Sequence, residues 1–415
     1  MTKHSILKPL VAALILTFLP PTAMASDEPA STQIDHILEE AYPTGGAGAA
    51  LLIYKDGEIL YRKAIGYADI EAKIPNTLDL KYRLASVTKQ FTAIAALRLV
   101  QEGKLDLDAD IRTYLPDFPN KGHIVTLRSA LAHTAGLYNY TNHDDYEAVQ
   151  TQDFTIEDIF QWFANEPLEF EPDTNWDYSN SGYALTSRVM EVVTGTSART
   201  LVREILFKPA GMTNSRFLMV NDQLADIPVD YNATHGPLKK VKDTGRAGFG
   251  DGEIISTVDD MLKWYLALKN DTLLQSQYKE IAFADNTLRN GQKTRYGLGY
   301  MLGHFDGEKS LEHGGSRSGS HAYSIMIPSQ DFFLIMFSNL RDNTIGITAA
   351  NIAKHALGIA GKRPPAFNAA RTMMQAWTGH YKHGENDIRT ITYKDGYLYS
   401  QRGDHGGKYK LLPMA

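Results

Sequence analysis

Ser86 and Lys89 carry a hydroxyl and an amine three residues apart, in the sequence Ser86-Val87-Thr88-Lys89. Side chains with this spacing lie on the same side of a helix. The Lys89 amine can then accept the proton that the Ser86 hydroxyl loses when it attacks a carbonyl carbon. The pair therefore predicts nucleophilic catalysis without a histidine base. The pattern is short, and it occurs three times, at residues 5–8, 86–89 and 276–279.

The middle copy differs from the other two in its surroundings. Residues 5–8 lie in a segment that we expect to be removed from the mature protein, and residues 276–279 form a polar stretch without an apolar pocket. Ser86 instead opens a predicted helix with Val87 and Phe91 on its apolar face. The positive end of the helix dipole and partial burial there favour an uncharged Lys89 amine. The alternative is a helix-capping serine followed by a solvated lysine.

Tyr178 and Asn180 form a second candidate motif, Tyr178-Ser179-Asn180, just before a predicted helix at 182–194. A phenol near an ammonium group can give up its proton and serve as a general base, or pass a proton to a leaving group. The Asn180 amide can bind a substrate carbonyl. The same tripeptide pattern recurs at 140–142, and alone it is more often loop packing than chemistry.

His313-Gly314-Gly315 is the third candidate, at the end of a predicted strand and directly before Ser316. Glycines let a substrate backbone lie against a strand edge, and an exposed backbone amide there can donate to a developing oxyanion. A second His-Gly-Gly lies at 405–407, and a simple turn is the alternative interpretation of either copy.

The predicted strands that must position these motifs come from both ends of the chain, with helices between them. We predict helices at 31–42, 87–101, 126–133, 182–194, 258–268 and 345–357, and strands at 48–54, 58–65, 296–302, 310–313, 323–327 and 332–338. This order predicts an α/β (α+β) fold in which one antiparallel sheet, flanked by helices, is built from both chain ends. A helical subdomain at about 84–270 is inserted between them, and a cleft between two such parts is a favoured ligand site.

The three motifs in this order resemble the serine β-lactamase and penicillin-binding protein superfamily. Within it the chain is most similar to the class C β-lactamase-related serine hydrolases, which include D-alanyl-D-alanine carboxypeptidases, D-aminopeptidases and esterases. The resemblance covers about residues 32–358 and is strengthened by the segments 131–137 and 255–261. It places a serine hydrolase domain at 26–362 and leaves a β-rich appendage at 363–415, which resembles the start of a lipocalin-like domain.

The resemblance implies a role for each motif residue. Ser86 would be the acylated nucleophile, with Lys89 and Tyr178 as the proton-handling pair, and either of them could be the main base. The substrate-binding residues would be Asn180, His313, Gly315 and Ser316. Asn180 would orient a carbonyl, the backbone N–H groups of Ser86 and Ser316 would form the oxyanion hole, and His313 would line the cleft. We expect structural roles for His133 and Asp260, and no metal or organic cofactor is implied.

His313 departs from the pattern of class C β-lactamases, which have lysine at this position to hold a substrate carboxylate. A histidine with an ordinary pKa is mostly neutral at pH 7. The difference favours ester, amide or D-amino-acid peptide substrates over β-lactams, although Arg317 could restore a positive charge. The remaining alternatives are a class C type β-lactamase and a non-catalytic protein that binds peptidoglycan peptides or β-lactams. No Gly-x-Ser-x-Gly occurs, which disfavours an α/β-hydrolase.

Residues 1–25 have the pattern of a secretory signal peptide, with two lysines before an apolar run and a small-residue cleavage site after Ala25. We therefore expect a periplasmic or secreted protein, with an uncleaved membrane anchor as the alternative. Removal of this segment moves the formal charge from −6 to −8. An acidic chain without basic clusters disfavours nucleic-acid partners. The absence of cysteine excludes disulfides and thiolate sites, and the sequence leaves the oligomeric state open.

Overall fold

The computed structural model describes residues 29–146, 152, 154–220, 222–234, 237–241, 248–317, 319–342, 344–361, 378–383, 387–394, 397–402 and 408–411. The predicted signal peptide, the first Ser-x-x-Lys copy at 5–8 and the second His-Gly-Gly at 405–407 lie outside these residues.

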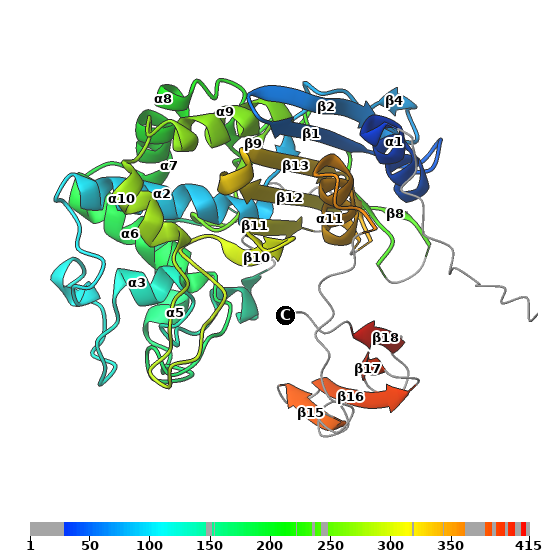
Figure 1. The fold of residues 1–415 in the computed structure, drawn as a ribbon. Helices are drawn as coiled ribbons and strands as arrows, with labels where there is room; N and C mark the ends of the chain where they lie inside the picture. The colour runs from blue at the N-terminus through cyan, green and yellow to red at the C-terminus, as the bar shows by residue number, and fades with distance from the viewer. Residues whose placement is uncertain are drawn as a thin grey trace, which may run out of the picture.

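A six-stranded antiparallel sheet stands at the centre of the described part of the chain (Figure 1). In spatial order its strands are β10 (Met301–Phe305), β11 (Glu308–Arg317), β12 (Ser320–Ile327), β13 (Phe332–Ser338), β1 (Ala49–Lys55) and β2 (Glu58–Ile65). β1 pairs with β13, with Ala49 opposite Ser338, so early and late parts of the chain meet inside one sheet. The predicted α+β fold is confirmed.

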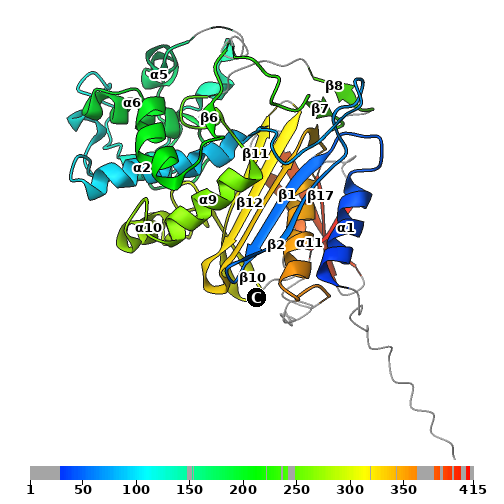
Figure 2. The ribbon, with the colours of Figure 1, turned by 90° about the horizontal axis from the view of Figure 1, so that it is seen from above.

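Helices cover both faces of this sheet (Figure 2). On one face α1 (Ala30–Ala41) packs against α11 (Ile345–Ala356), and a block of helices covers the other face. Alternate side chains of a strand point to opposite faces. In β1, Leu51 and Ile53 therefore join the core under α1 and α11, while Ala50 and Leu52 join the core of the helical block. Residues 49–54 are all buried in consequence.

The helical block surrounds α2 (Thr88–Gln101), whose residues 88–97 are buried on every side. The other helices of the block are α3 (Leu127–Leu131), α5 (Ile156–Ala164), α6 (Ser181–Thr194), α7 (Ala198–Val202), α8 (Lys208–Ala210), α9 (Val258–Lys269) and α10 (Ser276–Phe283), with a π-helical turn η4 (Arg203–Phe207). Short 3₁₀ turns are η1 (Ala85–Val87), η2 (Ile111–Thr113), η3 (Tyr140–Asn142) and η5 (Pro328–Gln330). None of the helices in the described ranges is both long and apolar enough to span a bilayer.

Short strands complete the fold. β5 (Tyr82–Arg83) pairs with β9 (Ile254–Ser256), which also pairs with β6 (Arg216–Phe217), and β5 leads directly into η1. The remaining strands are β3 (Tyr67–Asp69), β4 (Ile74–Pro75), β7 (Tyr231–Asn232), β8 (Lys239–Lys240) and β14 (Leu340–Arg341), and an antiparallel C-terminal sheet of β15 (Gly379–His383), β16 (Asp387–Lys394), β17 (Tyr397–Arg402) and β18 (Lys408–Leu411).

The segment 296–302 is not the strand that its alternating pattern predicts, because β10 begins only at Met301. The apolar side chains that produce the alternation are buried in an irregular segment: Tyr296, Leu298 and Tyr300. The glycines between them bring the backbone against two helices. A Cβ on Gly297 would lie 2.0 Å from the Ala282 carbonyl oxygen, and one on Gly299, where φ is +82°, would lie 2.8 Å from the Lys89 carbonyl oxygen. The alternation therefore reflects close backbone packing.

Candidate active site

Ser86 lies in η1, where the chain passes from β5 into α2. The residue before it, Ala85, has φ of +44°, a left-handed conformation that is uncommon for a residue with a side chain. Pairing of β5 with β9 and the hydrogen bond from Leu84 N–H to the Ile254 carbonyl hold this turn in place. Ser86 is half-buried in the middle of this turn. Strain at a position held by its neighbours is frequent where a reactive side chain must be presented.

Lys89 is fully buried one helical turn later, and its amine has three polar neighbours. Lys89 Nζ lies 3.3 Å from Ser86 Oγ, 2.7 Å from Asn180 Oδ1 and 3.0 Å from the Asp251 carbonyl oxygen. The amine also lies 4.9 Å from the centre of the Tyr178 ring. The structure thus brings the Ser86 and Lys89 pair into contact with Asn180, which lies 91 positions after Lys89 in the chain.

The two oxygens of Asn180 and Asp251 decide how the Lys89 amine is oriented. A carbonyl oxygen can only accept a hydrogen bond, so two Lys89 N–H groups are directed to these atoms. The remaining position on the amine faces the Ser86 hydroxyl, which can donate as well as accept. An uncharged Lys89 therefore points its lone pair at Ser86 Oγ, as a general base requires. The 3.3 Å separation is long for such a pair, as is common before a substrate is bound.

Asn180 caps the start of α6, and its amide is held from two sides. Its oxygen accepts from Lys89, its Nδ2 group donates to Thr141 Oγ1 at 3.4 Å, and its backbone N–H donates to Asn139 Oδ1 at 3.2 Å. The Nδ2 group is the part of Asn180 that can still donate to a substrate carbonyl. Tyr178, two residues earlier, is half-buried beside the Lys89 amine.

The second Tyr-x-Asn copy, at 140–142, has a different role. Tyr140 is fully buried, and its hydroxyl donates to the Asp251 carboxylate, lying 3.0 Å from each oxygen. Burial and the Asp251 carboxylate raise the pKa of Tyr140 well above its ordinary value. Tyr140 therefore stays protonated and supports the residue whose backbone carbonyl binds Lys89.

The third motif lies on β11, which continues to Arg317, beyond the predicted end at residue 313. Among the described strands β10 pairs with β11 only as far as Glu312, so the edge of β11 next to η1 is open beyond that residue. Gly315 approaches η1 so closely that a Cβ would lie 2.0 Å from the Leu84 carbonyl oxygen and 3.1 Å from the Ser86 nitrogen. Ser316 follows on the same strand, and its hydroxyl lies 2.9 Å from His321 Nε2.

His313 is fully buried. Its Nδ1–H donates to the Gly314 carbonyl at 2.7 Å, so its Nε2 accepts from the Tyr296 hydroxyl at 2.9 Å. Burial and the nearby Lys89 charge lower the pKa of His313 to about 3. The ring is therefore neutral at pH 7. Arg317, at the end of β11, is also buried.

The other sequence candidates lie away from the Ser86 hydroxyl. Ser276 opens a helix, α10, although residues 276–279 form a polar stretch, because the following apolar residues pack on the core. Its hydroxyl and the Lys279 amine both bind Asp271 at the surface. Asp260 is buried and accepts from Asn214 N–H and Ser215 Oγ.

Asp251 is the site residue that sequence reasoning missed, because it contributes a backbone carbonyl. A signal for it exists in the glycines of Gly248-Phe249-Gly250-Asp251-Gly252. A Cβ on Gly250, where φ is +91°, would lie 2.1 Å from Ser187 Oγ. Only a glycine lets this loop pass between α2 and α6 and reach Lys89.

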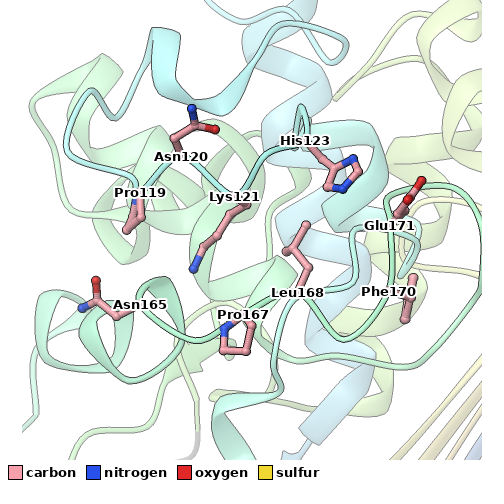
Figure 3. Close-up of a pocket in the computed structure, with 9 residues that line it drawn as sticks. All are labelled: Pro119, Asn120, Lys121, His123, Asn165, Pro167, Leu168, Phe170 and Glu171. Carbon is pink, nitrogen blue, oxygen red and sulfur yellow. The ribbon is translucent and has the colours of Figure 1, made fainter.

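A separate groove of about 630 Å³ lies on the surface of the helical block (Figure 3). It is formed by two loops, at 119–123 and 165–171, and contains none of the motif residues. Among the described residues, no three His, Asp or Glu side chains are placed to hold a metal ion.

Comparison with known proteins gives matches over most of the chain. The Beta-lactamase family model matches residues 35–384. Penicillin-binding protein 4* of Bacillus subtilis is 30% identical over 317 residues, which are 71% of this chain and 68% of that protein. Protein flp of Staphylococcus aureus is 24% identical over 75% of this chain and 64% of its own length. The chain thus spans about two thirds of the length of these two relatives.

Three solved structures with the same fold belong to proteins of different kinds. The octameric penicillin-binding protein homologue from Pyrococcus abyssi has a TM-score of 0.69 at 23% identity and covers 92% of this chain and 89% of its own. A D-stereospecific amidohydrolase from Streptomyces has a TM-score of 0.67 at 22% identity, and the match covers 79% of this chain and 99% of that chain. EstCE1, a hydrolase with promiscuous acyltransferase activity, has a TM-score of 0.68 at 20% identity, and the match covers 78% of this chain and 97% of that chain. At these identities the likeness concerns the fold alone.

Proposed function

Since the chain belongs to the Beta-lactamase family of serine hydrolases and penicillin-binding proteins, we propose that it is an exported hydrolase that forms an acyl-enzyme on Ser86. The observation that carries this proposal is the orientation of Lys89. Two of its N–H groups are directed to carbonyl oxygens, and its third position faces Ser86 Oγ at 3.3 Å. The signal-like residues 1–25 are the reason for proposing export.

Acylation begins when Lys89 takes the Ser86 proton and the serine oxygen attacks a substrate carbonyl. The negative charge that develops on the carbonyl oxygen needs N–H donors, and the backbone amides of Ser86 and Ser316 are the candidates. Tyr178, whose ring centre lies 4.9 Å from the Lys89 amine, is our candidate for passing a proton to the leaving group. Water then attacks the acyl-enzyme, and Ser86 regains its proton when the acid leaves.

The substrate class follows from the missing cation in the third motif. His313 is neutral and fully buried, so it offers no charge to a substrate carboxylate. We propose short esters, D-amino-acid amides and D-amino-acid peptides as substrates. A D-stereospecific amidohydrolase and a hydrolase with promiscuous acyltransferase activity among the proteins of the same fold support this choice. A class C type β-lactamase, or a non-catalytic protein that binds peptidoglycan peptides or β-lactams, is the competing outcome.

The test is intact-protein mass spectrometry after incubation with a fluorophosphonate probe and, separately, with a penicillin. Wild type and Ser276→Ala should each gain one fluorophosphonate adduct, and Ser86→Ala should gain none. Ser276→Ala is the matched control because it removes the serine of the other described Ser-x-x-Lys copy. The assignment fails if wild type is not labelled, or if Ser86→Ala hydrolyses p-nitrophenyl esters as fast as wild type.

A panel of substrates then separates the subclasses. We expect turnover of short-chain esters or D-amino-acid amides, and slow or no turnover of nitrocefin. Rapid nitrocefin turnover would identify a β-lactamase instead. Labelling by the penicillin without turnover of any compound would indicate a binding protein.

A further inference from the structure

His133 binds the two residues that flank Tyr178 in the chain. The His133 carbonyl oxygen accepts from Asp177 N–H at 3.0 Å, and His133 Nδ1 accepts from Ser179 N–H at 3.1 Å. Between these two hydrogen bonds, the imidazole ring lies 4.3 Å from the Tyr178 ring, centre to centre. One residue therefore fixes the backbone on both sides of Tyr178 and contacts its side chain.

We propose that His133 is a positioning residue that holds the Tyr178 phenol at the Lys89 amine. The inference rests on the proposed function, because it assumes that Tyr178 handles a proton in the reaction. It goes beyond that function by assigning a role in catalysis to a residue that we expected to be structural.

The hydrogen bonds of the ring define its protonation. Because Nδ1 accepts from Ser179, a neutral ring carries its proton on Nε2. Nε2 is buried and has no hydrogen-bond partner among the described residues. The imidazole ring itself packs against the aromatic rings of Trp176, Tyr183 and Tyr296. A ring protonated on both nitrogens would lose the Ser179 hydrogen bond.

The environment keeps the ring in this neutral form. The titratable groups facing it are Lys89, His313 and the phenols of Tyr178, Tyr183 and Tyr296. Burial, followed by repulsion from the Lys89 charge, lowers the pKa of His133 well below its ordinary value. His133 Nδ1 can therefore accept the hydrogen bond from Ser179 N–H over the whole neutral pH range.

The backbone of His133 also has an uncommon conformation, with φ of +62° at the end of α3. In this conformation both its carbonyl and its ring face residues 177–179. The preceding part of the same loop is held by backbone hydrogen bonds that do not involve His133. Asp173 N–H donates to the Thr134 carbonyl at 2.8 Å, and Glu169 N–H donates to the Gly136 carbonyl at 2.8 Å. Loss of the imidazole should therefore loosen the region of Tyr178 more than the rest of the loop.

The experiment compares His133→Leu with His133→Asn, in wild type and in a Tyr178→Phe background. Asparagine tolerates positive φ and places an acceptor oxygen near the position of Nδ1, whereas leucine has no acceptor. We expect His133→Leu to lower kcat/KM for a p-nitrophenyl ester by about a hundredfold, mainly through kcat, since small misplacements of a catalytic group have effects of this size. His133→Asn should recover most of that loss.

The Tyr178→Phe background provides a readout that a purely structural role would not change. If His133 acts through Tyr178, His133→Leu should lower the remaining activity by less than about threefold there, because the phenol is already absent. Equal losses in both backgrounds, or an Asn variant no better than Leu, would overturn the proposal. If His133→Leu does not melt cooperatively, His133→Gly replaces it, since glycine accepts positive φ.

Two controls separate this proposal from its premise. Thr126→Ala removes the capping box of α3, which lowers stability near His133 without touching Tyr178, and should leave kcat/KM unchanged below its melting temperature. Fluorophosphonate labelling of Ser86 is measured in every variant. Absence of labelling in wild type defeats the proposed function, whereas full labelling with unchanged kinetics in the His133 variants defeats only the role of His133.

Discussion

Asn180 Oδ1 lies 2.7 Å from Lys89 Nζ, closer than the Ser86 hydroxyl at 3.3 Å or the Asp251 carbonyl at 3.0 Å. The oxygen of an uncharged amide is thus the nearest neighbour of the amine. It orients Lys89 without adding a negative charge that would favour the ammonium form.

Asn180→Asp should therefore impair the enzyme while nearly preserving its shape. A carboxylate beside Lys89 favours the charged amine, which cannot take the Ser86 proton, so kcat/KM for ester hydrolysis should fall. The loss should shrink as the pH rises. The pH–rate profile of ester hydrolysis measures this. Asn290→Asp adds the same charge on an exposed turn and should leave the profile unchanged, and an Asn180→Asp profile equal to that of wild type contradicts the role of the amide.

Gly315→Ala should separate β11 from the turn that holds Ser86. Its Cβ would lie 2.0 Å from the Leu84 carbonyl oxygen, and Leu84 and Ser86 belong to the same turn. We expect a loss of about 1–3 kcal/mol in the free energy of unfolding, together with loss of Ser86 labelling. The adjacent Gly314→Ala is the control, because its Cβ meets only the Tyr323 ring, at 3.3 Å. Equal effects of the two substitutions on labelling would show that the close approach is unimportant.

The buried His313 should make stability depend on pH. Its folded pKa of about 3 lies below the ordinary value, so the unfolded chain binds a proton first as the pH falls. The stabilisation is complete above about pH 6.5 and is lost progressively toward pH 3, reaching about 2 kcal/mol lost at pH 5. Urea denaturation at pH 8 and pH 5 measures this loss. His313→Gln should lose correspondingly less between these pH values, and parallel behaviour of variant and wild type would contradict the assignment.

Tyr140→Phe should weaken the support behind Lys89. The substitution removes the hydroxyl that donates to the buried Asp251 carboxylate, and a buried acceptor that loses its donor costs about 1–3 kcal/mol. We expect that decrease in the free energy of unfolding, with a smaller decrease in kcat. The Tyr114 hydroxyl accepts from Asp106 N–H at an exposed site, so Tyr114→Phe should change stability by less than about 1 kcal/mol. A Tyr140→Phe variant as stable as wild type would show that Asp251 does not need this donor.

Local patterns were sufficient to predict most of the central sheet. The strands predicted at 48–54, 58–65, 323–327 and 332–338 correspond to β1, β2, β12 and β13, and the family resemblance is confirmed by the match over residues 35–384. The failure at 296–302 has a physical cause. Inward-facing Tyr296 and Leu298 produce the same alternation as a strand when glycines let the backbone pack against helices.

The sequence predicted only those contributions to the site that side chains make. Motif order placed Ser86, Lys89 and Asn180 together, and the structure has them in contact. The Asp251 contribution is a backbone carbonyl, which side-chain patterns do not reveal. The role of His133 depends on a positive φ and on two backbone partners, and both are set by tertiary packing.

The topology of the sheet also determines the order in which the parts of the site can form. Gly48 N–H donates to Asn339 Oδ1 at 2.7 Å across 291 residues of chain, and β1 lies between β2 and β13. Contacts of such separation form late, because the intervening chain must be ordered first. Ser86 and Lys89 belong to the early helical block, but β11, with Gly315 and Ser316, is synthesised more than 200 residues after Ser86. A chain synthesised only as far as the helical block would therefore hold the proposed nucleophile, Ser86, without the strand that we propose to bind the oxyanion.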